Sequence, residues 1–195
     1  MRSVSLAGIL AFLASAALMT AAAEPCDSAS ADHESGAGVE LRRLLPREMP
    51  GLPPKIREWM TDRAFTIPQS YCATVPNNAF RASIAKARSR DWVALCSRAD
   101  TSRIVIFWGG SPDSVTELRV SVDGSHSFWR GGKEFDYSRL IVPASVKSMR
   151  KLYSDFEVPF PKGIDHDSLE EVICEKASLV YYWRRGVVEE LLGMD

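Results

Sequence analysis

The sequence predicts an α+β protein with an antiparallel sheet of six or seven strands, built from hairpins, and two or three short helices. Runs rich in branched and aromatic residues occur in pairs joined by short polar turns, as in residues 91–110, which is typical of hairpins. Apolar residues at helical spacing are confined to a few short segments, several of them next to prolines. We therefore expect one globular α+β domain over residues 51–195.

Residues 1–23 have the pattern of an export signal. Arg2 provides a positive charge, residues 6–18 form an apolar run, and Ala21 to Ala23 provide the small residues of a cleavage site. The apolar run is shorter than the roughly 20 residues that a membrane-spanning helix needs. We expect a cleaved signal peptide, a periplasmic or secreted protein, and no transmembrane segment after cleavage.

Residues 24–50 are predicted to form a flexible N-terminal arm. Residues 24–40 are rich in serine, alanine, glycine and acidic side chains, so burial cannot compensate for the entropy lost on ordering. A proline-rich stretch follows and leads into a predicted helix over residues 55–63, in which Ile56 and Met60 have helical spacing.

Two further helices are expected. One covers residues 77–90, where Asn77 or Asn78 would cap the helix and Phe80 would face inward. The other covers residues 143–153, in which several apolar residues recur on roughly one face.

The remaining elements are predicted strands in three groups. Residues 91–97 and 102–110 form the first pair, and residues 114–122 and 126–130 form the second, joined by a turn at Asp123 and Gly124. The chain ends in a group of strands whose last turn is at Arg185 and Gly186; these strands cover residues 169–177, 178–183 and 187–193.

Four cysteines follow the signal, Cys26, Cys72, Cys96 and Cys174, and an exported protein meets an oxidising compartment where they can pair. We expect a disulfide between Cys72 and Cys96, because both lie in the dense part of the chain and close a loop of moderate length. Cys26 would then pair with Cys174 or stay free. The spacing contains no Cys-x-x-Cys motif of the kind found in zinc sites and thioredoxin-like proteins.

Two segments share a pattern of apolar strand, cysteine, polar turn, serine, apolar strand and tryptophan. They are residues 93–108 and residues 171–183. The similarity is explained either by a duplicated hairpin or by two unrelated hairpins of similar composition.

The run Asp91-Trp92-Val93-Ala94-Leu95-Cys96-Ser97, the following IVIFW strand and the C-terminal SLVYYW resemble a loosely defined group of uncharacterised secreted bacterial proteins. This resemblance covers residues 65–195 and implies export without implying an activity. The acidic turn before a strand is also faintly similar to FG-GAP repeats, the β units of integrin-type propellers. That similarity would imply a calcium loop of the form Asp-x-Asp-x-Asp-Gly, whereas residues 165–168 read Asp-His-Asp-Ser.

The acidic segment around Asp165, Asp167 and Glu170 is a candidate metal site, because hard cations need several oxygen ligands within one turn. The same carboxylates could act as the acid and base of a hydrolase. The alternative is a solvated polar loop in front of a strand.

Trp108, Trp129 and Trp183 each lie near the end of a predicted strand. They are candidate binding residues, because aromatic platforms for sugars lie at such positions. The alternative is that these side chains are simply part of the core.

The chain carries a formal net charge of −1, which argues against a nucleic-acid partner, and we expect no cofactor. The function that the sequence favours is that of an exported soluble protein, a non-enzymatic binding or envelope-associated protein whose partner is an envelope protein or a glycan. The alternative is a small secreted hydrolase that uses the loop from Asp165 to Glu170. A third class is a structural or stress-related envelope protein, which would have no small ligand.

Overall fold

The computed structural model describes residues 41–129 and 135–191, which belong to a compact unit spanning residues 38–195. The predicted signal peptide and residues 24–40 of the predicted arm lie outside these residues. No helix in the two described ranges is long and apolar enough to cross a membrane. In chain order the elements are β1 (Arg43–Leu44), η1 (Pro46–Glu48), α1 (Pro54–Asp62), β2 (Ile67–Pro68), β3 (Ala79–Ala82), β4 (Asp91–Arg98), β5 (Thr101–Phe107), η2 (Trp108–Gly110), β6 (Val115–Val122), η3 (Asp123–His126), β7 (Ser127–Trp129), β8 (Phe135–Tyr137), β9 (Arg139–Ala144), α2 (Val146–Asp155), β10 (Ser168–Ile173), β11 (Ala177–Arg184) and β12 (Val187–Leu191).

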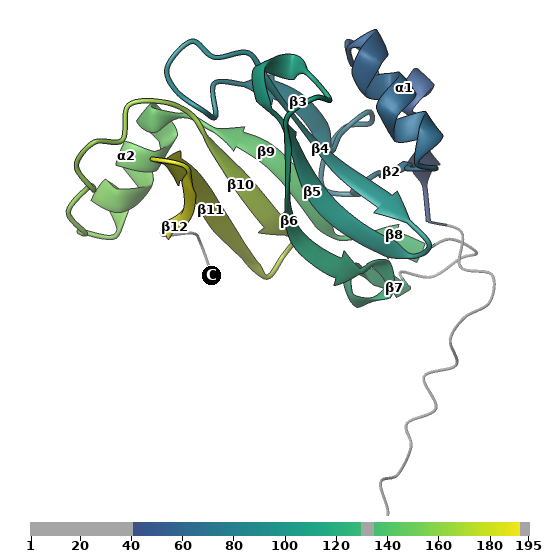
Figure 1. Ribbon diagram of the computed structural model, residues 1–195. Coiled ribbons are helices and arrows are strands. Elements are labelled where there is room, and N and C mark those ends of the chain that lie inside the picture. The colour runs from purple at the N-terminus through teal and green to yellow at the C-terminus, as the bar shows by residue number, and fades with distance from the viewer. Residues whose placement is uncertain (1–40, 130–134, 192–195) are drawn as a thin grey trace, which may run out of the picture. The chain divides into compact units, whose positions relative to one another are not determined.

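Two four-stranded antiparallel sheets dominate this unit (Figure 1). The first has the order β3-β4-β5-β6 and the second β9-β10-β11-β12, so neighbours in the chain are neighbours in each sheet. Two small two-stranded sheets, β1-β2 and β7-β8, complete the described strands. The prediction of antiparallel hairpins is confirmed, but the predicted number of six or seven strands was too low.

Each four-stranded sheet contains a hairpin that is closed by a two-residue turn. Ala99 and Asp100 between β4 and β5 have φ values of 48° and 55°, and Arg185 and Gly186 between β11 and β12 have 53° and 82°. Two successive positive φ values form the two-residue turn that matches the twist of antiparallel strands. The predicted turn at Arg185 and Gly186 is therefore confirmed.

One apolar core lies between the two four-stranded sheets. Val93 and Leu95 of β4 pack there with Leu169 of β10 and Tyr181 of β11. Alternate residues face the other way, because successive side chains of a strand point to opposite faces. Ala94 packs against α1, which covers the outer face of the first sheet.

The second sheet has the same arrangement on its own outer face. Val180 and Tyr182 of β11 pack against Met149 of α2. The predicted helices at residues 55–63 and 143–153 correspond to α1 and α2, and each covers one sheet. Ser145 caps α2 by accepting a hydrogen bond at its Oγ from the backbone N–H of Ser148, at 3.0 Å.

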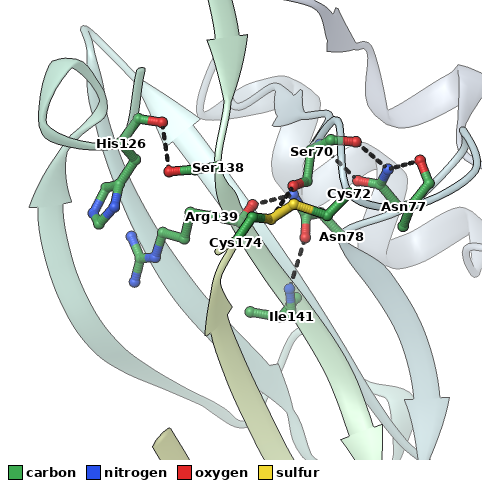
Figure 2. The surroundings of a disulfide bond; sticks show 10 residues. Ser70, Cys72, Asn77, Asn78, His126, Ser138, Arg139, Ile141 and Cys174 are labelled. Atoms are coloured by element: carbon green, nitrogen blue, oxygen red, sulfur yellow. Dashed lines mark hydrogen bonds between the residues drawn. A yellow bond between two sulfur atoms is a disulfide. The ribbon is translucent and has the colours of Figure 1, made fainter. Parts of the chain in front are cut away.

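The side chain of Asn78 joins the two sheets. It is 2% exposed, its Oδ1 accepts a hydrogen bond from the Ile141 N–H at 2.8 Å, and its Nδ2 donates to the Arg139 carbonyl at 3.1 Å. The same Nδ2 donates to the Pro68 carbonyl at 2.7 Å. β3 and β9 belong to different sheets and do not pair through their backbones. The side chain of Asn78, which directly precedes β3, connects the two sheets instead (Figure 2).

The predicted helix over residues 77–90 is wrong. Asn78 has a φ of 66°, a conformation that ends a helix, and its side chain is committed to β9. Residues 79–82 form β3 against β4. The buried carboxylate of Asp91 accepts hydrogen bonds from the N–H groups of Ile84 and Ala85 at 2.9 and 2.8 Å, and these bonds hold the rest of the segment in a loop.

The predicted pairing of residues 114–122 with 126–130 is also wrong, because β7 pairs with β8 instead of β6. Asp123 is 1% exposed, and its Oδ2 accepts hydrogen bonds from Arg43 at 2.8 Å and Ser97 at 2.5 Å. These bonds pull η3 against the β4-β5 hairpin, so the chain turns away from β6 before β7 begins.

The predicted flexible arm extended to residue 50, but contacts of residues 41–50 correct this boundary. Leu41 and Met49 are buried, and Arg43 on β1 reaches the Asp123 carboxylate. The apolar residues of this segment distinguish it from residues 24–40. Residues 41–50 therefore belong to the folded unit.

The predicted Cys72–Cys96 disulfide is wrong, because Cys72 pairs with Cys174 (Figure 2). The two Cα atoms are 6.2 Å apart and 102 positions apart in the chain. Cys96 on β4 faces away from the core between the sheets and is buried beneath α1 as a free thiol. Burial raises the pKa of the Cys96 thiol, and a thiol with a raised pKa is unreactive.

We predict that reduction of the Cys72–Cys174 disulfide lowers the free energy of unfolding by about 2–5 kcal/mol, because it frees a long loop in the unfolded chain. Urea unfolding with and without dithiothreitol measures the change. Cys72→Ser/Cys174→Ser should abolish the response to the reductant, and Cys96→Ala should keep it. Loss of the response in Cys96→Ala would contradict the pairing.

We predict that Asn78→Gly lowers the free energy of unfolding by about 2–4 kcal/mol, since it leaves buried groups of Ile141, Arg139 and Pro68 without partners. Glycine adopts the backbone conformation of Asn78 freely, so the loss reports the side-chain bonds. Ala99→Gly is the matched control, because Ala99 is exposed and also has a positive φ. Equal effects in the two variants, measured by urea unfolding, would show that Asn78 does not hold the sheets together.

Candidate functional site

Two of the three candidate tryptophans lie in contact. The ring centroids of Trp108 and Trp183 are 4.5 Å apart, with a tilt of 45° between the rings. Trp108 directly follows β5 of the first sheet, and Trp183 lies near the end of β11 in the second. Both side chains are half-buried and pack against the core between the sheets. We call these two residues the tryptophan pair.

Strand alternation explains why the two rings meet. Ile104 and Ile106 face the shared core, and Trp108 continues that alternation beyond the end of β5. Tyr181 and Trp183 do the same on β11. The Trp108 Nε1–H donates to Thr116 Oγ1 of β6 at 2.9 Å, which fixes the ring.

The two strands that carry the tryptophan pair occupy equivalent places. The segments that share a sequence pattern, residues 93–108 and 171–183, cover the hairpin β4-β5 and most of the hairpin β10-β11. Each hairpin forms the two central strands of its sheet. The final tryptophan of one pattern therefore contacts the final tryptophan of the other.

Trp129 lies in a different sheet from the two strands that carry the tryptophan pair. It is on β7, opposite Phe135 of β8, and it is 65% exposed. The structure thus brings together two of the three tryptophans proposed from the sequence.

The turn that holds Trp108 is organised by Asp91. Asp91 is fully buried, and its Oδ1 accepts a hydrogen bond from the Gly109 N–H at 2.8 Å. Gly110 has a φ of 73°, and a Cβ there would lie 3.1 Å from the Arg90 carbonyl. Only glycine fits this close approach without strain. Asp91 therefore ties the β3-β4 loop to the turn that carries Trp108.

The acidic residues proposed as metal ligands have separate partners. Asp167 Oδ2 accepts a hydrogen bond from the Ser83 N–H at 3.1 Å, and Asp165 Oδ1 lies 3.4 Å from Tyr182 Oη. Glu170 lines a pocket of about 210 Å³ beside α2. Within residues 41–129 and 135–191, no group of three or more histidine, cysteine, aspartate or glutamate side chains could hold a metal ion. The predicted metal site gains no support from this arrangement.

A buried polar cluster between the sheets was not foreseen from the sequence. Arg139 on β9 is fully buried, and its Nε donates to Glu171 Oε1 of β10 at 2.6 Å. Its Nη1 donates to Ser102 Oγ of β5 at 2.9 Å, and its Nη2 to the Arg119 carbonyl of β6 at 2.6 Å. One guanidinium therefore binds three strands other than its own, from both sheets.

The partners of Arg139 are bonded to further buried groups. Glu171 is 4% exposed, accepts a hydrogen bond from Tyr181 Oη at 3.0 Å and lies 3.3 Å from Arg119 Nε. Burial and the Glu171 carboxylate raise the pKa of Tyr181. Burial raises the pKa of Tyr137, whose hydroxyl bonds Ser102 Oγ at 2.9 Å, to about 12.

A β-bulge provides the Arg119 carbonyl. The register of β5 and β6 shifts between Ser102 and Ile104, and Arg119 opposite this shift has a φ of 52°. An extra residue in one strand leaves its backbone groups outside the ladder. That conformation turns the Arg119 carbonyl toward the Arg139 guanidinium.

Burial and the charge of Arg139 lower the pKa of His126, which lies next to the cluster. Clusters of groups with altered pKa values occur both in active sites and in structural ion-pair networks. Here the strong bonds of Arg139 and Glu171 are made to one another and to their neighbours. One sequence signal could have revealed this cluster. Arg139 on β9 is two positions before the core residue Ile141, and Glu171 on β10 is two positions after the core residue Leu169, so each charged residue faces the core.

Comparison of the chain with protein-family models, with curated proteins and with solved structures gives no match in any of the three. The resemblance to uncharacterised secreted proteins and to FG-GAP repeats therefore stays a prediction.

We predict that Glu171→Gln lowers the free energy of unfolding by about 3–5 kcal/mol, because it leaves the fully buried Arg139 without a carboxylate partner. Arg119→Ala is the control. Its side chain is 49% exposed, and the variant keeps the carbonyl that binds Arg139, so the expected cost is below about 1 kcal/mol. Guanidinium unfolding of both variants measures the difference, and a larger loss in Arg119→Ala would contradict the assignment.

Proposed function

We propose that the protein is an exported, non-enzymatic binding protein that recognises a glycan of the cell envelope at the tryptophan pair. The observation that carries the proposal is the contact between Trp108 and Trp183 across the two sheets. Both residues are partly exposed, so part of their surface is available to a ligand.

Export is supported by two independent features. Residues 1–23 have the pattern of a signal peptide. The Cys72–Cys174 disulfide is typical of a protein in an oxidising compartment, because the cytosol keeps thiols reduced.

A glycan is supported by the chemistry of the rings. Indole offers a large, rigid apolar face with a polar N–H at its edge, and the apolar face of a sugar ring can stack against it. Trp108 is held by Thr116 and Trp183 lies within a strand. Both rings are thus ordered before a ligand arrives, which reduces the entropy lost on binding.

Binding is favoured over catalysis by the way the titratable groups are used. Tyr137, Tyr181 and Glu171 form their hydrogen bonds inside the buried cluster around Arg139. The carboxylates of the alternative hydrolase are likewise engaged separately, with Asp167 on the Ser83 N–H and Asp165 beside Tyr182.

We predict that Trp183→Ala weakens binding of envelope glycan fragments by about 2 kcal/mol, or roughly thirtyfold in Kd, because it removes a central aromatic contact. Trp108→Ala should act in the same direction. Isothermal titration calorimetry of the mature, oxidised protein measures both.

Trp129→Ala is the control and should leave Kd unchanged, because Trp129 lies on β7, outside both four-stranded sheets. Circular dichroism establishes that each variant is folded, and Trp183→Phe keeps an aromatic ring in the core should the alanine variant unfold. Unchanged affinity in folded Trp183→Ala and Trp108→Ala variants, or no binding of any fragment to the original protein, would refute the proposal.

A further inference from the structure

The segment beside the tryptophan pair is strongly basic. From the end of β3 through the β3-β4 loop the chain carries four basic and no acidic side chains, namely Arg81, Lys86, Arg88 and Arg90. All four are exposed. We call this segment, residues 81–90, the basic loop.

The charges of the basic loop are not neutralised within the described part of the chain. No ion pair between described residues involves any of the four. Some basic residues elsewhere have a carboxylate partner, for example Lys151 with Asp155 at 2.5 Å and Arg103 with Glu117 at 2.9 Å. The basic loop therefore presents a concentrated positive charge to solvent.

The basic loop is fixed at both ends. Asp91 accepts hydrogen bonds from Ile84 N–H and Ala85 N–H, and from the Ser89 hydroxyl. Ser83 Oγ also donates to the Ser89 carbonyl at 3.2 Å. A loop held by so many bonds presents its charges in a preorganised way, which favours binding.

The basic loop and the tryptophan pair are neighbours. The Arg90 carbonyl lies against Gly110, and Asp91 binds the Gly109 N–H, one residue after Trp108. Figure 1 shows the β3-β4 loop and the β5-β6 connection at the same end of the first sheet. The backbone that carries Arg90 thus lies beside the turn that carries Trp108, so one extended ligand would span both features.

We propose that the glycan bound at the tryptophan pair is acidic, and that the basic loop contacts its carboxylate or phosphate groups. This inference rests on the proposed function. Positive side chains bind such anions by charge-assisted hydrogen bonds, and the indoles bind the uncharged faces of the sugar rings.

An anionic membrane surface fits the same charge less well. Membrane-binding segments combine basic residues with exposed apolar side chains that enter the lipid. The large apolar residues found exposed in the described ranges all lie outside the basic loop, and Ile84 within it is 1% exposed. The chemistry of this surface therefore favours a charged sugar over a bilayer.

The test compares matched ligands and matched variants of the mature, oxidised protein. The ligands are oligogalacturonate and its neutral methyl ester, and phosphorylated dextran oligosaccharide with unmodified dextran. The test variant is Lys86→Ala/Arg88→Ala/Arg90→Ala. The control, Lys55→Ala/Lys147→Ala/Lys176→Ala, makes the same change in net charge at exposed positions elsewhere.

We expect the test variant to bind an acidic ligand at least tenfold more weakly and the control to change Kd less than twofold. Binding of the neutral ligands should respond to neither, and affinity for the acidic ligand should fall with salt, because salt screens exposed charges. The carboxylate and phosphate arms identify which anion is recognised.

Equal binding of acidic and neutral glycans, lost only in Trp183 variants, would overturn this inference and leave the proposed function standing. Absence of all glycan binding would overturn both. Binding of the original protein to phosphatidylglycerol vesicles, lost in the test variant and without glycan binding, would replace the glycan by a membrane surface.

Discussion

The two four-stranded sheets are joined by side chains rather than by a shared backbone ladder, and the rest of the unit depends on that junction. Asn78 bonds the carbonyl of Arg139 and the N–H of Ile141 at the start of β9. Because this junction sets how the sheets face one another, it also determines which core residues meet. The contact between Trp108 and Trp183, which come from different sheets, is a consequence of it. The disulfide between Cys72 and Cys174 links two distant segments of the chain beside the same junction, as Figure 2 shows.

A second link between the sheets crosses their interior. Arg139 and Glu171 lie in the second sheet, and Ser102 and the Arg119 carbonyl lie in the first. A buried ion pair contributes little net stability, because removing its charges from water offsets their attraction. Its bonds are directional, however, and a shift of one sheet against the other would leave a buried guanidinium unpaired. We infer that this pair selects one arrangement of the sheets among the many that an apolar core alone would allow.

The sequence predicted what short-range patterns determine. The hairpins β4-β5 and β11-β12 and the helices α1 and α2 follow from alternation, helical spacing and turn residues close in the chain. Most of the errors involve contacts between residues distant in sequence. The helix expected over residues 77–90 is prevented by bonds from Asn78 to β9 and from Asp91 to the loop. Cysteine proximity in the chain favoured Cys96, but strand alternation directs that residue beneath α1. Trp108 and Trp183 were identified as candidates, whereas their contact and the neighbouring basic loop required the folded chain.

The most direct test of the binding account is a nuclear magnetic resonance titration of the mature, ¹⁵N-labelled protein with an acidic oligosaccharide. The chain has five tryptophans, at positions 59, 92, 108, 129 and 183, and each indole N–H gives its own signal. The account predicts that the signals of Trp108 and Trp183 shift together, with backbone signals of the β3-β4 loop, while those of Trp59 and Trp129 stay in place. Saturable shifts confined to Trp129, or none at the tryptophan pair while the ligand binds elsewhere, would contradict it.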